Sequence, residues 1–407
     1  MNPETQLPAA EKNPESSPDS RPDLRPNLRP DLRITSEHGS ARTQPQLFPE
    51  PAETRFLKWM LFGPKGVRVG WSVALFLVLT FLSMGVLGSV AALLLPNVFH
   101  VKPGVFTPAS AITEELLQFL GLLAAAAICA LIERRRILDY NLRGPNRALH
   151  FFAGLLGGFI ALTALVGALY AGGWLHLGAV SLSGIAIVRF GALWALVFLL
   201  TGLSEEGMTR CYMLFTLARG MNYWWALGSV TSFSMLALWN SHGSGSGGVY
   251  LMALLGVAPC LVLHLKKSAS AGFWQAAWLT STFFGYVHTF NKGETWVGIF
   301  SAAAIGFVFC ASVRLTGSAW WAIGFHAAWD WAQTFFYGTA DSGIQPTGHL
   351  LNTSPAGAAI WSGGSDGPEG SLLVIPVILF VLIVLILIYG RRARVESPSP
   401  VAQPQLS

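Results

Sequence analysis

One short stretch of the chain places several ionisable side chains inside an apolar run: SEEGMTR at positions 204–210. A charged side chain in hydrocarbon costs on the order of 3 kcal/mol on insertion scales, so such residues are candidates for function. Glu206 and Arg210 are four residues apart, share one face of a helix and can pair. Glu205 lies about 100° round the helix and stays free of that pair. One carboxylate is therefore neutralised and the other is available as a general base. The alternative is a buried ion pair that only fixes helix packing.

Two further stretches put histidine into apolar helices. Phe284 and His288, in FGYVH, share one helix face, and so do His326 and Asp330, in HAAWD. The functional interpretation is a pair of catalytic or binding groups. The structural alternatives are a hydrogen-bonded histidine near the membrane boundary and a His–Asp pair that bridges two helices.

Other polar residues are expected to be structural. The pair Glu114 and Glu115 follows Ser110 at the expected start of a helix, where acidic side chains suit the macrodipole and face the aqueous boundary. His242 lies in a Gly/Ser-rich turn and is left out of the site. The four cysteines lie in apolar runs without a CxxC pair, so we expect small buried hydrophobic residues rather than disulfides or metal ligands. They are Cys129, Cys211, Cys260 and Cys310.

The composition shows which environment must hold these side chains. The chain has 407 residues, of which 52% are hydrophobic and only 12% are charged. That charged share is about half of the usual share in a soluble domain. An ordinary cytosolic enzyme, a disordered protein and a nucleic-acid binder are therefore disfavoured. The net charge of +5 fits a membrane protein with basic cytoplasmic loops.

About ten apolar runs are near the length needed to cross roughly 30 Å of hydrocarbon. They indicate an all-α polytopic membrane bundle. The runs are 71–96, 114–131, 150–171, 185–203 continuing to 217, 224–239, 249–264, 274–287, 296–313, 320–336 and 372–389.

The basic residues between these runs fall on one side if both termini are cytoplasmic. We therefore expect an integral protein of a bacterial cytoplasmic (inner) membrane. The first segment carries the repeat RPDL-RPNL-RPDL, in which proline at every fourth position forbids a helix. The expected division is a disordered Pro/Arg-rich cytoplasmic tail (1–52), N-terminal membrane helices (53–188), a catalytic core (189–338), a non-cytoplasmic loop (339–370), a C-terminal transmembrane helix (371–391) and a disordered tail (392–407).

Taken together, the EExxxR, FxxxH and HxxxD motifs, in this order on three helices, resemble the CPBP family of intramembrane proteases. That family includes CAAX prenyl protease 2 of the Rce1 type and the lysostaphin-resistance-protein-A-like proteins. The resemblance covers roughly 190–337, and the stretch TGSAWWAIGFHAAWD at 316–330 is especially similar. It implies a CAAX protease-like helical core and hydrolysis of a peptide bond in a membrane-associated, possibly lipidated, protein or peptide.

The resemblance also implies roles for individual residues. Glu205 matches the residue that activates water, and Glu206 with Arg210 matches the supporting ion pair. His288 matches the partner that orients or shares that water. His326 and Asp330 match the pair that stabilises the oxyanion of the tetrahedral intermediate.

Asp330 raises a chemical question, because the family has Asn or Asp at this position and an ionised Asp cannot donate a hydrogen bond. Asp330 must be protonated, orient His326 or bind a cation. A zinc ion held by Glu205, His288, His326 and Asp330 is a second possibility, in keeping with the family's common classification as metalloendopeptidases. The absence of an HExxH helix favours a metal-free mechanism.

Two further points depart from simple expectation. Two apparent spans separate EExxxR from FxxxH where one is expected, which indicates an inserted hairpin. Hydropathy also puts His288 near the end of its span and Glu205 in the middle of its own, so a broken, tilted or re-entrant helix near Asn291 is needed to bring them together.

The sequence therefore predicts an intramembrane endopeptidase in which Glu205 and His288 activate water. The expected partners are the lipid bilayer and a protein or peptide substrate, and no nucleic acid is expected. The alternative is a non-proteolytic membrane-binding or bacteriocin-immunity-like protein. A transporter that uses Glu205 as a proton carrier is a third reading, but no inverted repeat of broken helices supports it.

Overall fold

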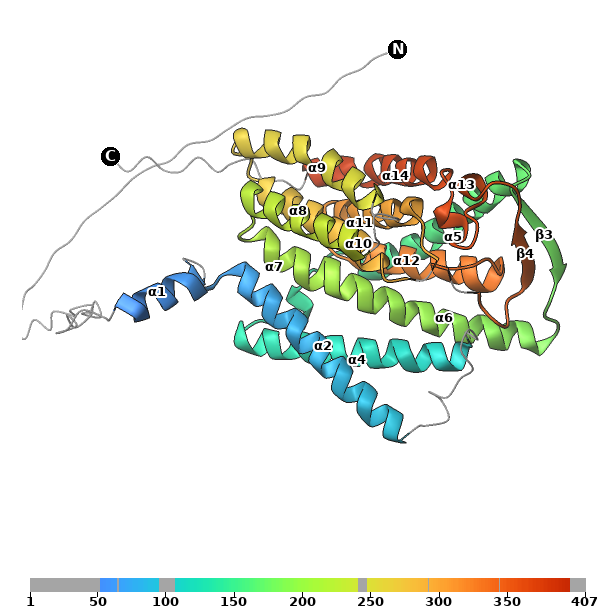
Figure 1. Ribbon diagram of the computed structural model, residues 1–407, viewed down its shortest axis with the longest axis horizontal. Coiled ribbons are helices and arrows are strands. Elements are labelled where there is room, and N and C mark those ends of the chain that lie inside the picture. Colours follow the sequence, from blue (N-terminus) through green and yellow to red (C-terminus); the bar gives the residue numbers. More distant parts are fainter. Residues whose placement is uncertain are drawn as a thin grey trace, which may run out of the picture. The chain divides into compact units, whose positions relative to one another are not determined.

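The computed structural model describes residues 52–63, 66–94, 107–240, 247–291, 293–343 and 345–395. These residues are mostly helical (Figure 1). The helices are α1 (Ala52–Leu61), α2 (Val69–Leu94), α4 (Pro108–Ile132), α5 (Arg147–Ala171), α6 (Ile185–Glu206), α7 (Leu214–Ala218), α8 (Tyr223–Asn240), α9 (Gly247–Leu265), α10 (Ala271–His288), α11 (Trp296–Thr316), α12 (Trp320–Trp331), α13 (Ala359–Ser362) and α14 (Val374–Val395). Two π-helical segments, Gly207–Met213 and Ala332–Phe336, continue α6 and α12.

Six helical runs in the described part of the chain are long and apolar enough to cross a membrane. They are α2, α4, α5, the continuous run Ile185–Ala218, α9 and α11, and α14 adds a shorter apolar stretch, Val374–Gly390. The expected all-α polytopic class is confirmed, whereas the count of about ten spans is not. The N-terminal tail, His242 and the end of the C-terminal tail lie outside the described residues.

Glycines allow the helix that carries the HxxxD motif to approach its neighbour closely. In α5, Gly154 and Gly158 form a GxxxG pair, and a Cβ at Gly158 would lie 2.2 Å from the backbone oxygen of Phe325 in α12. A Cβ at Gly324 of α12 would likewise lie 2.2 Å from the oxygen of Phe151 in α5. Small residues at such positions let backbones pack in contact, which is how helices associate without a hydrophobic driving force in lipid. The packing fixes α12 against α5.

The same principle joins α12 to α6, which carries the EExxxR motif. A Cβ at Gly202 in α6 would lie 3.0 Å from the oxygen of Ile323 in α12. On its other side, α6 runs beside α4 (Figure 1). The acidic motif of α6 is therefore enclosed between α4 and α12.

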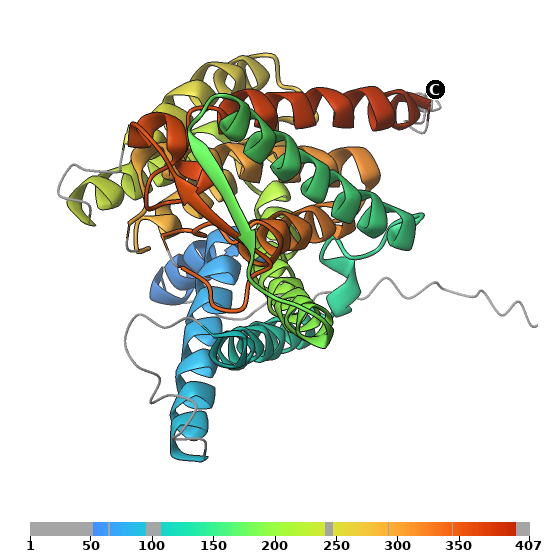
Figure 2. The ribbon, with the colours of Figure 1, turned by 90° about the vertical axis from the view of Figure 1, so that its right-hand side faces the viewer.

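The segment 339–370, expected only as a loop, has structure of its own. Its strand β4 (Leu351–Pro355) pairs antiparallel with β3 (Leu175–Val180), which follows α5. Figure 2 shows this pair crossing one end of the helices. A second pair, β1 (Phe62–Gly63) with β2 (Gly66–Val67), joins α1 to α2. The long segment is tied to the helices and is available to line a site.

The expected inserted hairpin corresponds to α8 and α9. Both helices pack on α10 and on each other, and α9 also packs on α11. They add a layer outside α10, which carries the FxxxH motif, and outside α11.

Candidate active site

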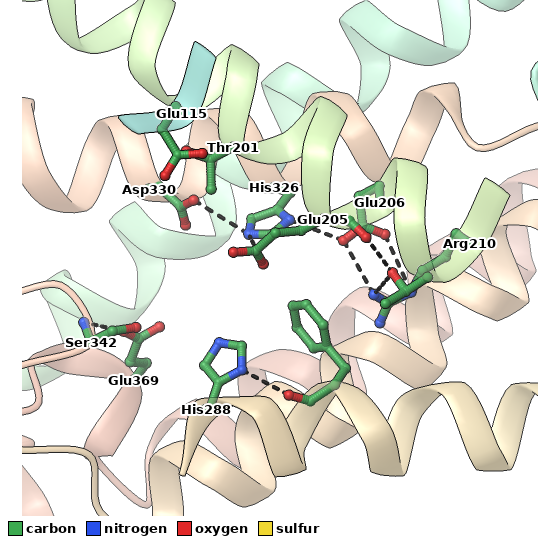
Figure 3. Close-up of polar contacts among 12 residues, drawn as sticks. Glu115, Thr201, Glu205, Glu206, Arg210, His288, His326, Asp330, Ser342 and Glu369 are labelled. Carbon is green, nitrogen blue, oxygen red and sulfur yellow. Dashed lines mark hydrogen bonds and ion pairs between the residues drawn. The ribbon is translucent and has the colours of Figure 1, made fainter. Parts of the chain in front are cut away.

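A cavity of about 260 Å³ lies among α4, α6, α10, α11, α12 and α14, and residues of the 339–370 segment complete its wall. Glu205, His288, His326 and Asp330 all line it (Figure 3). Four of the six residues singled out by sequence therefore share one cavity, although they come from three helices far apart in the chain. The other two, Glu206 and Arg210, are fully buried beside it.

Glu206 is the centre of a buried charge network. Its Oε2 lies 3.3 Å from Nε of Arg210, and its Oε1 lies 3.0 Å from Nδ1 of His326. The expected pair with Arg210 is thus formed, but the bond to His326 was not foreseen. A buried carboxylate needs such compensation, because desolvation of an unpaired charge costs several kcal/mol.

The guanidinium of Arg210 is held by aromatic rings as well as by Glu206. It lies 4.3 Å from the ring centroid of Phe284 and 5.5 Å from that of Phe309. These distances fit cation–π attraction, which is stronger where water is excluded. Gly306 leaves room for the group, because a Cβ there would lie 2.2 Å from Nη2 of Arg210. The phenylalanine of FxxxH therefore packs on the arginine of EExxxR.

The backbone changes geometry directly after the glutamate pair. Regular α-helix ends at Glu206, and a π-helical segment runs from Gly207 to Met213. Such segments are rare and often occur at functional sites. The sequence predicted one uniform helix to Leu217, and nothing in the residue pattern reveals the wider turn.

Glu205 is the accessible carboxylate of the pair. Its side chain keeps 30% of its surface exposed, and its Oε2 lies 3.8 Å from Nε2 of His326. Arg210 is committed to Glu206. Glu205 therefore presents a carboxylate to the cavity.

His326 has one nitrogen in the charge network and one facing the cavity. Because the Glu206 carboxylate can only accept, Nδ1 carries the proton of the 3.0 Å bond. Nε2 lies 3.4 Å from Oδ2 of Asp330. Glu206 thus sets the orientation of the ring, while Asp330 and Glu205 flank its outer nitrogen.

His288 is the last residue of α10 and lines the cavity opposite Glu205 (Figure 3). Its Nδ1 lies 2.8 Å from the carbonyl oxygen of Phe284, so this nitrogen donates. Nε2 is then an acceptor for a group in the cavity. The helix end at His288 brings the residue to the same space as Glu205.

The four cavity residues do not form a metal-binding set in this structure. In the parts of the chain that the structure describes, no three His, Cys, Asp or Glu side chains are grouped so that they could hold a metal ion. His326 uses one nitrogen for Glu206 and His288 uses one for a backbone carbonyl, and each keeps its other nitrogen for the cavity, which also suits a metal-ligating histidine. The possible zinc set of Glu205, His288, His326 and Asp330 therefore stays a prediction.

Glu115 was expected to be a structural residue that faces the aqueous boundary. The second part of this interpretation is wrong, because Glu115 lines the cavity. Thr107 caps α4 and Pro108 begins it, so the helix starts well before Glu114. Glu115 consequently lies inside the helix and lines the cavity, whereas Glu114 is exposed. The capping box of Thr107 with Ser110 is the signal that could have shown the true start.

The 339–370 segment contributes Asp341, Ser342 and Glu369 to the cavity wall. Oε1 of Glu369 accepts hydrogen bonds from the backbone N–H of Ser342 at 2.9 Å and from Nε2 of Gln333 at 3.2 Å. Oδ2 of Asp341 accepts from Oγ1 of Thr334. No sequence motif marks these residues, because only the fold of the long segment brings them to the site.

Asp366 fastens the same segment to the start of α11. Oδ2 of Asp366 accepts hydrogen bonds from the backbone N–H of Thr295 at 3.0 Å and from its Oγ1 at 2.7 Å. Burial and the nearby Asp366 raise the pKa of Glu294 to about 10. Burial and Glu369 raise the pKa of Asp366 to about 7. Burial and the neighbouring carboxyl groups therefore favour the protonated forms here, although the hydrogen bonds from Thr295 favour ionised Asp366.

Residues 260–332 match the family described as type II CAAX prenyl endopeptidase Rce1-like. The match includes the FxxxH and HxxxD motifs and confirms the resemblance on which the sequence interpretation relied. It covers less than a fifth of the chain and leaves EExxxR outside. No curated protein and no solved structure matches the chain. With its apolar helices, the chain is an integral membrane protein resembling a protease family.

Proposed function

Since residues 260–332 carry the Rce1-like family pattern, we propose that this chain is an intramembrane endopeptidase. It hydrolyses a peptide bond in a membrane-associated protein or peptide, in CAAX-type processing or a related reaction. The observation that carries the proposal is the shared cavity of Glu205, His288 and His326, with His326 held from behind by Glu206.

In the proposed reaction, Glu205 and His288 act on one water molecule. Nε2 of His288 accepts a hydrogen bond from the water and orients it, and the Glu205 carboxylate removes a proton as the oxygen attacks the peptide carbonyl. A general base within reach of its proton typically contributes 10²–10⁴-fold to a rate. Glu205 then passes the proton to the leaving amine as the C–N bond breaks.

His326 stabilises the oxyanion formed in this attack. Its outer nitrogen, Nε2, lies beside both Glu205 and Asp330 and carries a proton. This N–H donates a hydrogen bond to the oxyanion. Such donors act strongly where water is scarce and where they need no reorganisation. Asp330 orients His326 instead of donating itself, which is supported by its 3.4 Å contact with Nε2.

Glu206 and Arg210 are positioning residues in this scheme. They hold His326 from the side away from the cavity, so neither touches the substrate. We further propose that both termini are cytoplasmic and that the protein resides in a bacterial inner membrane, on the distribution of Lys and Arg between the apolar runs.

The proposal is tested with purified full-length protein in proteoliposomes and a panel of lipidated peptides, with products identified by mass spectrometry. Wild type should cleave at least one peptide, and Glu205→Gln should lower kcat by about 10²–10⁴-fold. His288→Ala should lower it as well, and Glu114→Gln is the matched control. Cleavage at the wild-type rate by Glu205→Gln or His288→Ala would overturn the proposal.

A trapping experiment separates an enzyme from a binding or immunity protein. In an enzyme, Glu205→Gln accumulates uncleaved substrate that wild type releases as fragments. A protein that only binds shows the same intact partner with either chain.

A further inference from the structure

Asn141 lies in the loop between α4 and α5 and joins the two helices that carry the EExxxR and HxxxD motifs. Its side-chain Nδ2 donates a hydrogen bond to the carbonyl oxygen of Arg210 at 2.7 Å. Its own carbonyl oxygen accepts a hydrogen bond from the backbone N–H of Ala319 at 2.8 Å, directly before α12. One residue outside the three motifs therefore contacts both the π-helical segment after the glutamate pair and the start of the HxxxD helix.

The backbone of this loop gives the Asn141 side chain a definite direction. Asn141 has a φ of 54°, in the left-handed region that Asn adopts more readily than most residues. The carbonyl oxygen of the next residue, Leu142, accepts a hydrogen bond from Nε1 of Trp320 at 3.0 Å. Two successive carbonyl groups of the loop are thus bound to the start of α12, so the loop is fastened to the helix that carries His326.

The carbonyl group of Arg210 is a sensitive place for the other contact. It lies in the π-helical segment Gly207–Met213, where the turn is wider than in a regular α-helix. A carbonyl oxygen has two lone pairs, so the amide of Asn141 can bind it in addition to a partner within the helix. This donor from outside the helix fixes the backbone of the residue whose Nε lies 3.3 Å from Oε2 of Glu206.

These contacts form a closed ring through the buried charge network, part of which Figure 3 shows. Arg210 pairs with Glu206, and Glu206 holds Nδ1 of His326 at 3.0 Å. His326 lies on α12, which begins directly after Ala319. Asn141 completes the ring, because it links Ala319 back to Arg210. Each contact in a ring joins groups that the other contacts already hold close, so the loss of one weakens the rest.

Arg210 also supports the first glutamate of EExxxR. Its Nη1 donates a hydrogen bond to Oγ1 of Thr209, and this hydroxyl donates to the carbonyl oxygen of Glu205. Displacement of Arg210 therefore disturbs both the proposed base and the histidine proposed to bind the oxyanion. Small displacements matter for such groups, since a misplacement of about 1 Å can lower a rate by about 10²-fold.

We propose that Asn141 is a positioning residue for catalysis: through Arg210 and Glu206 it holds His326 in the orientation that the reaction needs. This proposal rests on the endopeptidase activity proposed above. Asn141 is not among the described residues that line the cavity, so it does not touch the substrate. Its loss should therefore lower kcat and leave KM nearly unchanged.

The loop itself supplies a matched pair of variants. Asn146 lies in the same loop with a φ of 51°, but its side chain does not cap α5. Glycine fits the left-handed region, so Asn141→Gly and Asn146→Gly each remove one side chain without straining the backbone. Asn141→Asp is a second variant, because it keeps the size of the side chain and replaces the donor with an oxygen that repels the Arg210 carbonyl.

The first measurement follows the His326 contact without any substrate. Full-length protein with ¹⁵N-labelled histidine and tryptophan is studied by NMR in detergent, and the Nδ1–H signal is assigned by its loss in His326→Gln. Exchange of this proton with water should be about 3- to 10-fold faster in Asn141→Gly, the effect of one lost hydrogen bond. The indole N–H of Trp194, which donates to the carbonyl oxygen of Thr347 in the first half of α6, is the internal reference and should keep its rate. In Asn146→Gly both rates should equal those of wild type.

The second measurement is steady-state kinetics on a cleaved peptide in proteoliposomes, well below the unfolding midpoint of each variant. Asn141→Gly should lower kcat by about 3- to 10-fold, with KM within about twofold of wild type. Asn141→Asp should lower kcat further, and Asn146→Gly should match wild type. Equal acceleration of exchange at His326 and Trp194 would assign Asn141 to the general stability of the fold and overturn the proposal.

The proposal is also overturned if Asn141→Gly leaves the His326 exchange rate or kcat unchanged, if Asn146→Gly has the same effect, or if neither Asn141 variant folds. The endopeptidase activity fails separately. If wild type cleaves no peptide while Asn141→Gly accelerates exchange at His326 alone, that activity is refuted and the link from Asn141 to His326 stands.

Discussion

Nδ1 of His326 lies 3.0 Å from Oε1 of Glu206, so the second glutamate of EExxxR holds the histidine of HxxxD. The two residues are 120 positions apart. Through this contact, the buried Glu206–Arg210 pair acts on the cavity without reaching it. The pair therefore does more than fix the packing of one helix, because it also fixes which nitrogen of His326 faces the site.

Glu206 should be important for stability as well as activity. Glu206→Ala leaves Arg210 buried without its partner and His326 without its anchor, and breaking a buried pair costs about 3–5 kcal/mol. We expect a clear fall in the midpoint of thermal unfolding in detergent. Glu205→Gln, which removes a half-exposed carboxylate, should leave that midpoint almost unchanged. Equal midpoints for the two variants would show that the contacts of Glu206 with Arg210 and His326 do not stabilise the fold.

Asp330 should act by orienting His326. Asp330→Asn keeps an oxygen that can face Nε2 and should retain activity within about fivefold. Asp330→Leu removes the contact and should lose about 1–3 kcal/mol of transition-state stabilisation, or about 5- to 150-fold in kcat/KM. Steady-state kinetics on one cleaved peptide make the comparison. Full activity in Asp330→Leu would show that the contact has no role.

The α5–α12 contact should tolerate no side chain at its closest points. A Cβ at Gly158 would lie 2.2 Å from a backbone oxygen of α12, so Gly158→Ala should separate the helices and lower both stability and activity. Gly167 lies on the same helix with nothing within 4 Å of its Cβ position. Gly167→Ala should be neutral or stabilising by up to about 1 kcal/mol. Thermal unfolding of the two variants, measured side by side, checks this prediction.

The fold around Glu294 and Asp366, where the 339–370 segment meets α11, should lose stability as the pH rises. The pKa of Glu294 is raised from 4.5 to about 10 and that of Asp366 from 3.8 to about 7. The folded state therefore holds protons that the unfolded chain releases, and this makes stability fall as the pH rises above about 4. Most of the Asp366 effect is lost by about pH 7, and the Glu294 effect extends towards pH 10.

Glu294→Gln mimics the protonated group and should flatten this dependence. Unfolding midpoints between pH 5 and pH 9 should converge for wild type and Glu294→Gln at the acidic end and separate at the basic end, with the variant more stable. Glu114→Gln should follow wild type throughout. Parallel curves for wild type and Glu294→Gln would show that ionisation of Glu294 does not cause the loss of stability.

Metal chelation should leave activity intact. In the part of the chain that the structure describes, no three His, Cys, Asp or Glu side chains are grouped to hold a metal ion, and the Glu205 carboxylate can act on water directly. We expect 1,10-phenanthroline to change kcat by less than about twofold, whereas a zinc enzyme would lose its activity and regain it with added zinc. Metal analysis of the same purified sample completes the measurement.

The motif residues could be identified from sequence because charge and histidine stand out against an apolar background. Each motif contains two residues that are four positions apart. This spacing places the two side chains on one helix face whatever the tertiary structure. The free Glu205 and the paired Glu206 follow from that geometry alone. The helical membrane class follows from the length and apolar composition of the runs.

Glu115 shows where this reasoning failed. Its surroundings depend on where α4 begins and on what packs against it. Because the start of the helix was predicted too late in the chain, a residue of the cavity was expected at the surface. Asp341 and Glu369 carry no local signal at all, since a long segment between helices has no periodicity to reveal which side chains turn inward.

By itself, the sequence determined the helical membrane class, the three motifs and the local pairing of Glu206 with Arg210, because these depend on composition and on spacing within one helix. Only the tertiary structure decided that Glu206 also holds His326, that Glu115 shares the cavity and that the 339–370 segment closes its wall. Those relationships depend on distances between elements far apart in the chain. Such distances are set by close backbone packing, as at Gly158 and Gly324, and packing is a property of two surfaces together.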